Sequence, residues 1–172
     1  GSNNFALGIP TFCVSIGLLK GDEIIAGVIH HPILNHTYFT EKGKGAWLEG
    51  NRLGVNKKSS MASSTFAYTC GYSTSSELEE SLIHKLNKKR VKRLLQSWCP
   101  TYELCLLAAG KIEGIINNEN ELYDYCAGKL IAKEAGAKIT DFDGNPEVKD
   151  KSNIFIISNG TKIHQELLEL IK

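Results

Sequence analysis

The chain has 172 residues, 42% of them hydrophobic and 23% charged, so it is long enough for one domain with a real core or for two packed layers that share one. Its 20 Lys and Arg residues oppose 19 Asp and Glu residues, and this net charge of +1 argues against a globally basic nucleic-acid binder and against an acidic disordered tail. The five cysteines are odd in number and include no C-x-x-C pair, which argues against a disulfide framework and a zinc site and predicts a reducing, cytoplasmic location.

Residues 1–56 have the pattern of an antiparallel β meander. Apolar side chains alternate at Val14, Ile16 and Leu18, which is the period of a β-strand. The predicted strands, separated by short turns, are 12–20, 24–31 and 37–40. Glycines then interrupt the segment EKGKGAWLEGN, where they permit positive φ angles or a close approach of another backbone.

Residues 57–172 instead alternate between predicted strands and predicted helices. The predicted strands are 64–71, 90–96, 112–117, 137–141 and 153–159. The predicted helices are 75–89, 101–111, 121–136 and 161–172. Strands and helices that alternate at this spacing are typical of a layered α/β fold, so we expect a second, α/β domain over this range.

Asp124 is the strongest candidate for a functional carboxylate. It falls at the start of a predicted helix, and the small residues Ala127 and Gly128, one turn later, allow that helix end to lie close to another backbone. An acidic residue in a first turn also stabilises a helix by complementing its dipole, by about 0.3–1 kcal/mol. From its position alone, Asp124 is either a functional carboxylate or a helix-stabilising one.

Three histidines form a second candidate. His30, His31 and His36 could contribute to a metal site, because neutral imidazole is a common metal ligand. His30 and His31 are adjacent, however, and neighbouring residues of a strand point to opposite faces. A surface turn is the alternative that we favour.

The sequence contains one candidate surface for a macromolecular partner. The stretch KLNKKRVKR, at 85–93, could contact nucleic acid or a phosphorylated substrate. Cations also collect at helix C-termini for dipole reasons, and no aromatic residue interleaves here to stack on bases. RNA is therefore a possible but not favoured partner. No apolar run approaches the roughly 20 residues of a membrane span and no charged-then-apolar leader opens the chain, so we expect no membrane partner.

Four segments together resemble the inositol monophosphatase family of magnesium-dependent phosphatases. GSNNFALGIPTFCVSIGLLKGDEIIAGVIHHP resembles the family segment that begins D-P-x-D-G-[ST]-x-N-F, and EKGKGAWLEGNRLGV resembles its glycine-rich turn. LCLLAAGKIEGII, followed by LYDYCAGKLIAKEAGAKITDFDGNP, resembles the family motifs W-D-x-A-A-G and E-A-G-G in order and spacing. The resemblance covers nearly the whole chain and corresponds to the C-terminal majority of a family member.

The resemblance implies a fold. It is the layered α-β-α-β-α sandwich of the inositol monophosphatase and fructose bisphosphatase type, here without its N-terminal helical layer. Residues 1–56 would be the remainder of an N-terminal domain, and residues 57–172 the C-terminal α/β domain.

The resemblance also implies site residues. Asp124 would be a Mg²⁺ ligand, and the backbone amides of Gly1 and Ser2 would hold the phosphate. On this interpretation the opening Gly-Ser is the native end of D-G-[ST], although such a dipeptide is also a common remnant of a cleaved tag. Asn117 stands where inositol phosphatases have an acidic residue that binds sugar hydroxyls, and we expect it to contact substrate.

The departures from the family pattern bear on activity and substrate. The family's glutamate and both aspartates of D-P-x-D would precede Gly1, so we expect the 172 residues alone to be inactive. Tyr123 replaces the usual Trp, and SWCPTYEL replaces the small G-[ST]-A stretch beside the substrate. Inositol phosphate, a sugar phosphate such as fructose bisphosphate, and a phosphoadenosine all stay open as substrates.

Three functional hypotheses follow. The first is a magnesium-dependent phosphomonoesterase acting on inositol monophosphate or a similar small sugar phosphate, homodimeric when complete. The second is an accessory protein of the same family, associated with RNA or a transcription complex through KLNKKRVKR. The third is a non-catalytic binding module.

Overall fold

The computed structural model describes residues 1–72, 74 and 76–171, and its first sheet is the meander expected from the sequence. Every neighbouring pair of strands in this sheet, called sheet A, is antiparallel, and the strands follow one another in chain order. The strands are β1 (Val14–Lys20), β2 (Glu23–His31), β3 (His36–Glu41), β4 (Ala46–Leu48) and β5 (Asn51–Arg52). The last two lie within and beside the glycine-rich stretch that we had expected to be turns.

The second sheet, sheet B, has the mixed order β7-β6-β8-β10-β9. Its strands are β6 (Thr65–Cys70), β7 (Arg93–Leu95), β8 (Gly114–Asn118), β9 (Lys138–Thr140) and β10 (Ile154–Ser158). β6 runs parallel to β7 and β8, whereas β10 is antiparallel to β8 and β9. All five residues of β8 are buried, as expected of a central strand covered on both faces.

Four helices agree with the sequence patterns, and a fifth does not. The helices of the described residues are α1 (Ser2–Ala6), α2 (Ser76–Lys88), α3 (Pro100–Ala108), α4 (Leu122–Glu134) and α5 (Ile163–Ile171), with a 3₁₀ turn at Met61–Ser63. The sequence patterns predicted only strands in the first fifty residues, so α1 is a correction. It is held by the buried Asn4 side chain, whose amide nitrogen donates to the carbonyl oxygens of Thr11 and Ser97, each at 2.7 Å. Ser97 lies 93 residues away, beyond the reach of a local pattern.

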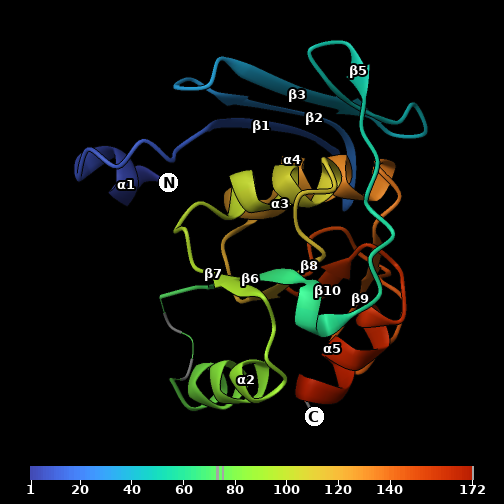
Figure 1. The fold of residues 1–172 in the computed structure, drawn as a ribbon. Helices are drawn as coiled ribbons and strands as arrows, with labels where there is room; N and C mark the ends of the chain where they lie inside the picture. Colours follow the sequence, from blue (N-terminus) through green and yellow to red (C-terminus); the bar gives the residue numbers. More distant parts are fainter. Residues whose placement is uncertain (73, 75, 172) are drawn as a thin grey trace.

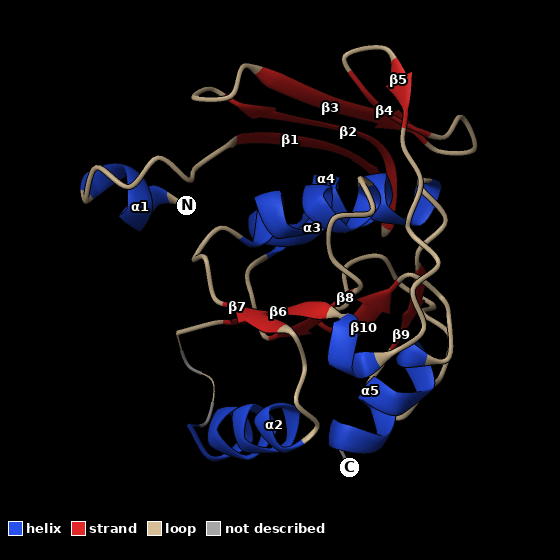
Figure 2. Ribbon diagram, in the orientation of Figure 1, coloured by secondary structure: helices blue, strands red, loops and turns tan. Residues whose placement is uncertain are grey.

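The elements stack in four layers, as Figures 1 and 2 show. Sheet A covers one side of the α3–α4 layer, sheet B covers the other side, and α2 and α5 lie against the far face of sheet B. α4 is buried without interruption from Tyr125 to Ala132, because it is enclosed between two sheets. The layered sandwich predicted from the resemblance is confirmed.

One core cluster joins the two sheets through the helical layer. It contains Ile29 and Tyr38 of sheet A, and Ala67, Ile115 and Phe155 of sheet B, together with apolar residues of α3 and α4. The predicted division into domains at residue 56 stays a prediction. All five cysteines are free thiols. Within the described part of the chain, no helix has both the length and the apolar character needed to cross a bilayer.

The outer face of sheet A is apolar and open to solvent. Val14, Ile16 and Leu18, which alternate along β1, are 57%, 64% and 56% exposed. Val28, which pairs with Ile16, and Phe39, which pairs with Val28, extend the same surface across the sheet. No helix among the described residues covers this face, in agreement with a sandwich that lacks its N-terminal helical layer.

Small residues let α4 approach its neighbours closely. A Cβ atom added to Gly128 would lie 2.8 Å from the Leu104 Cβ atom on α3. A Cβ atom added to Gly27 on β2 would lie 3.0 Å from the Ala127 Cα atom, and one on Gly17 of β1 would overlap with the Cys126 sulfur. Three consecutive residues of α4 are therefore in tight contact with α3, β2 and β1.

A buried lysine fastens the segment before β10 to α4. Lys129 is 0% exposed, and its Nζ atom donates to Glu147 Oε1 at 2.7 Å and to the carbonyl oxygens of Asp150 and Ser152 at 2.9 and 2.6 Å. The same Nζ atom lies 4.0 Å from the centre of the Phe155 ring. Burial lowers the pKa of Lys129 to about 8, against the opposing effect of Glu147.

His164 of α5 is a second buried titratable side chain. Its ring is 2% exposed, with Nδ1 2.8 Å from Ser158 Oγ and Nε2 3.0 Å from Thr140 Oγ1. Burial, reinforced by the charge of Lys138, lowers the pKa of His164 to about 4. The folded protein therefore holds this imidazole neutral at pH values where an unfolded chain would protonate it.

We predict that Gly128→Val lowers the free energy of unfolding by about 1–3 kcal/mol or more, because the added methyl groups overlap with Leu104 on α3. Gly54→Val is the matched control, since a Cβ atom at Gly54 meets no atom within 4 Å. Urea denaturation of both variants measures the difference. Equal stability of the two variants would show that the packing of α4 on α3 is looser than described.

We also predict a pH dependence of stability that arises from His164. Between about pH 6.5 and pH 4 the unfolded chain binds a proton at this residue and the folded chain does not, so stability falls as the pH is lowered through that range. His164→Gln should flatten this slope, because glutamine keeps a polar group in place but does not titrate. Urea midpoints at about pH 7, 5.5 and 4.5 test the prediction. A slope identical to that of the unmodified protein would contradict it.

Candidate functional site

The N-termini of α3 and α4 lie together at one edge of the molecule. Thr101 Oγ1, in the first turn of α3, donates to the backbone carbonyl oxygen of Asp124 at 2.8 Å, in the first turn of α4. One turn further along, Leu104 contacts Gly128, so the two helices run parallel. Two aligned helix dipoles therefore present their positive ends to the same place, which favours an anion.

The start of α1 meets these helix ends. A Cβ atom added to Gly1 would lie 3.0 Å from the sulfur of Cys99, the N-cap residue of α3. Gly1 is the N-cap of α1, and Ser2, the first residue of α1, is exposed. The structure thus brings Gly1 and Ser2 to the edge where α3 and α4 begin, and their assignment as phosphate contacts stays a prediction.

Asp124 is half-buried at this edge. It is the third residue of α4, after the N-cap residue Glu121. Burial raises the pKa of the Asp124 carboxyl above its usual value, and a backbone hydrogen bond from Glu121 opposes the rise. Both roles considered for Asp124, ligand and helix stabiliser, remain compatible with this position.

Asn117 lies deeper than a substrate contact would require. Its side chain is 1% exposed; its Oδ1 atom accepts from Thr69 Oγ1 and Asn120 Nδ2, each at 2.9 Å, and its Nδ2 atom donates to the Asn153 carbonyl oxygen at 2.7 Å. These bonds join β6, β8, the segment before α4 and the start of β10. One of the two Nδ2 hydrogens of Asn117 is left for a further bond, although the side chain is almost fully buried, and the role of Asn117 stays a prediction.

The alternative candidates lie elsewhere. His31 packs its ring against Tyr102, with centroids 4.6 Å apart, and His30 Nδ1 lies 3.0 Å from Thr37 Oγ1. Among the described residues, no three His, Cys, Asp or Glu side chains are grouped closely enough to hold a metal ion. The basic stretch runs from the end of α2 to the first residue of β7, and α2 lies on the face of sheet B opposite to α4 (Figure 1).

Glu103 was not identified from the sequence. It is 0% exposed on α3, and its Oε1 atom accepts from the backbone nitrogen and the hydroxyl of Ser97, at 2.9 and 2.6 Å. Burial raises the pKa of Glu103 to about 7, and its Oε2 atom has no hydrogen-bond partner among the described residues. A lone acid in an otherwise apolar helix was the available signal. Glu103 is linked to α1 through Ser97, because the Ser97 carbonyl oxygen accepts a hydrogen bond from the Asn4 side-chain amide.

Trp98 follows Ser97 in an unusual backbone conformation. Its φ is 56°, in the left-handed region that favours glycine. Holding a bulky residue there costs about 1–3 kcal/mol, and such strain persists only where the surroundings impose it. The bonds of Ser97 to Glu103 and Asn4 impose it here, one residue before the N-cap of α3.

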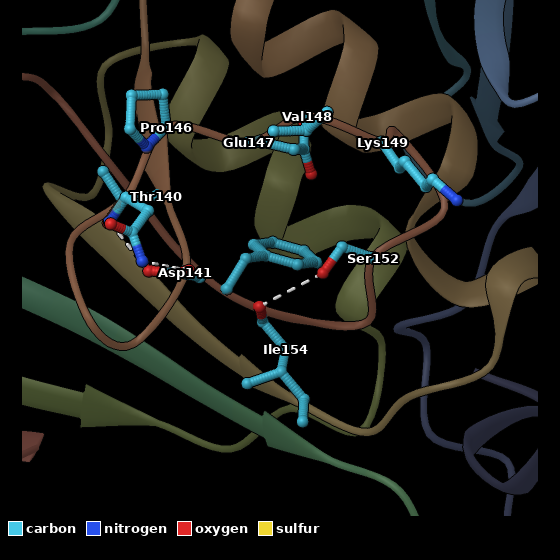
Figure 3. Close-up of a pocket in the computed structure, with 10 residues that line it drawn as sticks. Thr140, Asp141, Pro146, Glu147, Val148, Lys149, Ser152 and Ile154 are labelled. Atoms are coloured by element: carbon cyan, nitrogen blue, oxygen red, sulfur yellow. Dashed lines mark hydrogen bonds between the residues drawn. The ribbon is translucent and has the colours of Figure 1, made fainter.

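A separate cavity of about 460 Å³ lies between β9, β10 and the loop that joins them. Figure 3 shows Thr140 and Asp141 on one side of it, and Lys149 and Ser152 on the other. Glu147 contributes to the wall, but its carboxylate is already bound by Lys129 and Lys133. None of the residues predicted for the site lines this cavity, neither Asp124 and Asn117 nor Gly1 and Ser2.

Mg²⁺ suits the chemistry of the edge where α3 and α4 begin, but only in part. Asp124 offers a hard carboxylate oxygen, and neighbouring helix N-termini favour a phosphate, which Mg²⁺ takes as a further ligand. Among the described residues, Asp124 belongs to no group of three or more His, Cys, Asp or Glu side chains that could hold a metal ion. Asp124 therefore fits as one member of a larger ligand set.

Comparison with known proteins identifies the family. The model of the inositol monophosphatase family matches residues 1–172. The chain is 32% identical to the fructose-1,6-bisphosphatase/inositol-1-monophosphatase of Thermotoga maritima over 173 residues, which cover 99% of this chain and 64% of that protein. The chain therefore belongs to the inositol monophosphatase family.

Two further relatives extend this result. The crystal structure of the extragenic suppressor protein suhB from Bartonella henselae matches with a TM-score of 0.89 at 28% identity, over 100% of this chain and 66% of that one. The Nus factor SuhB of Buchnera aphidicola is 31% identical over 94% of this chain and 60% of its own length. The chain thus spans slightly less than two thirds of the length of these relatives.

Proposed function

We propose that this chain is part of a Mg²⁺-dependent phosphomonoesterase that hydrolyses inositol monophosphate or a similar small sugar phosphate. The observation that carries the proposal is the position of the half-buried Asp124 at the edge where the N-termini of α3 and α4 meet and where Gly1 contacts the N-cap residue of α3. The names of the relatives as inositol monophosphatases and fructose bisphosphatases support the same reaction class.

The residues have distinct roles in this proposal. Bound Mg²⁺ supplies Lewis-acid stabilisation of the phosphate and activation of the attacking water, without a covalent enzyme intermediate. Asp124 binds the ion through its carboxylate, and the amides of Gly1 and Ser2 hold phosphate oxygens. The positive ends of α3 and α4 add to the attraction for the phosphate. Asn117 orients the substrate hydroxyls, either directly or through its bonds to Thr69 and Asn120.

The proposal includes a limit on the 172 residues themselves. Mg²⁺ binds with near-octahedral geometry and gives up water reluctantly, so one carboxylate alone is a weak site for the ion. We propose that further carboxylates come from the part of the complete protein that these 172 residues do not span. The 172 residues alone would then release no phosphate. We also propose that the complete protein is a cytoplasmic homodimer.

Asp124→Asn tests the proposal in the complete protein. The variant keeps size and shape but removes the charge, so we expect turnover to fall roughly a hundredfold or more, about 2.7 kcal/mol in activation free energy. Stability should fall by at most about 0.3–1 kcal/mol, the contribution of a first-turn acid to the helix dipole. Phosphate release at saturating Mg²⁺ and thermal melts provide the two measurements.

Glu121→Gln is the matched control for Asp124→Asn. Glu121 is exposed, lies three residues earlier and makes no side-chain capping bond, so its loss of charge should leave turnover nearly unchanged. Near-normal turnover of Asp124→Asn together with a lower melting temperature would remove Asp124 from the site and leave it as a helix-stabilising residue.

A second candidate function is that of an accessory protein associated with RNA or a transcription complex. Relatives named Nus factor SuhB support this alternative, and Lys88, Lys89 and Lys92 of the basic stretch are exposed. A non-catalytic binding module is the third possibility.

We predict that replacing Lys88, Lys89 and Lys92 by Gln changes kcat and KM for phosphate release less than about twofold, because these side chains are exposed at or just after the end of a helix, α2, that lies on the other side of sheet B from α4 (Figure 1). Filter retention of RNA at two salt concentrations, on the same preparations, tests the alternative. Salt-sensitive retention that disappears in the variant, or a large rise in KM, would show that the stretch is functional.

A further inference from the structure

Two segments of the chain cross in close contact just before α4. Gly71 follows β6 and Glu119 follows β8, and these two parallel strands pair as far as Cys70 and Asn118. A Cβ atom added to Gly71 would overlap with the carbonyl oxygen of Glu119 and would lie 3.0 Å from its carbonyl carbon. The Gly71 backbone nitrogen also donates to the Asn118 carbonyl oxygen at 2.9 Å. Only glycine allows this approach, because any side chain would displace the other backbone.

The backbone of Glu119 has an unusual conformation at this crossing. Its φ is 60°, in the left-handed region that is disfavoured for a residue with a Cβ atom. The Glu119 nitrogen donates to the carbonyl oxygen of Asn153, before β10, at 2.9 Å. This bond and the contact with Gly71 come from two segments far away in sequence. Together they hold the turn between β8 and α4 in a conformation that its own residues do not favour.

The side chain of Asn120 holds the same turn through buried hydrogen bonds. Asn120 is 5% exposed, and its Nδ2 atom donates to Thr69 Oγ1 at 2.6 Å and to Asn117 Oδ1 at 2.9 Å. Thr69 Oγ1 in turn donates to Asn117 Oδ1 at 2.9 Å. Three polar side chains, from β6, β8 and the turn, therefore bond to one another in the interior, where an unpaired member would be costly.

Asp124 follows this turn closely along the chain. Asn120 precedes Glu121, the N-cap residue of α4, and Asp124 is the third residue of the helix. The Asp124 backbone nitrogen donates to the Glu121 carbonyl oxygen at 2.9 Å, so the first turn of α4 continues directly from the held turn. Thr101 binds the Asp124 carbonyl oxygen from α3. The Asp124 backbone is thus held from two sides, by α3 and by the turn.

We propose that Gly71 and Asn120 are positioning residues that set the place of the Asp124 carboxylate for Mg²⁺. This deepens the proposed function, on which it rests, because there Asp124 binds the ion. Gly71 and Asn120 act through the backbone of the turn and contact neither the ion nor the substrate. Mg²⁺ demands near-ideal octahedral geometry, so a carboxylate displaced by a change in the turn binds the ion less well. Residues that orient a metal ligand commonly change metal affinity 10- to 100-fold.

Calorimetric titration of the complete protein with Mg²⁺, in the absence of substrate, tests the inference. We expect Gly71→Ala and Asn120→Ala each to weaken Mg²⁺ binding about 10- to 100-fold, because each variant shifts the turn that leads to Asp124. Gly54→Ala is the matched control with no expected change, since a Cβ atom at Gly54 meets no atom within 4 Å. Asp124→Asn gives the affinity that is left when the charge of the carboxylate is removed.

Thr69→Val provides a milder change in case Gly71→Ala or Asn120→Ala does not fold. Valine keeps the shape of threonine but neither accepts from Asn120 nor donates to Asn117, so Mg²⁺ affinity should fall in the same direction. Thr69→Ser keeps the hydroxyl and should restore it. Urea midpoints of the same variants separate positioning from stability. A purely structural role would lower the midpoint and leave the Mg²⁺ affinity of the folded protein unchanged.

The outcomes separate this inference from the proposed function. Unchanged Mg²⁺ affinity in the folded variants, together with a loss in Asp124→Asn, would overturn the positioning role and leave the phosphatase proposal standing. Unchanged affinity in Asp124→Asn itself would overturn the role of Asp124 on which both rest. A rise in KM in Thr69→Val with unchanged Mg²⁺ affinity would show that the network acts on Asn117 instead of Asp124, and would also overturn the positioning role.

Discussion

The close contact of α4 with α3 and sheet A is the constraint on which the rest of the structure depends. Cys126, Ala127 and Gly128 follow one another on α4 and meet β1, β2 and α3 at distances where a larger side chain would overlap. Close packing in a protein interior transmits such constraints, because side chains there have little free volume. The α3–α4 layer therefore has one position relative to sheet A, and that position also determines where both helices begin.

The candidate site is a consequence of this packing. The contact between Leu104 and Gly128 sets the register of α3 against α4. The hydrogen bond from Thr101 to the Asp124 carbonyl oxygen fixes the same register at the helix N-termini. With the two N-termini aligned, their dipoles add, and a half-buried carboxylate lies beside them. The proposed function uses this arrangement to bind a phosphate next to a Mg²⁺ ion.

Buried polar groups connect this edge to distant parts of the chain. Glu103 orders Ser97, Ser97 accepts from Asn4, and the short helix α1 is thereby held against the start of α3. Lys129 ties the segment before β10 to α4 from the other side of the layer. A buried polar group without its partner is costly, so each of these bonds specifies one arrangement of segments that lie far apart in sequence.

The sequence by itself determined the local elements and the family. Period-two alternation at Val14, Ile16 and Leu18 marked β1, and acids in the first turn and glycines after the last turn marked α4, because these signals arise from neighbouring residues. Only the tertiary structure decided where the site residues lie. It formed α1 through Asn4 and Ser97, buried Asn117 within sheet B, and left Trp98 exposed in a left-handed backbone conformation. These outcomes depend on contacts between residues that are close in space but separated in sequence, or on a backbone strain that only the surrounding fold can sustain.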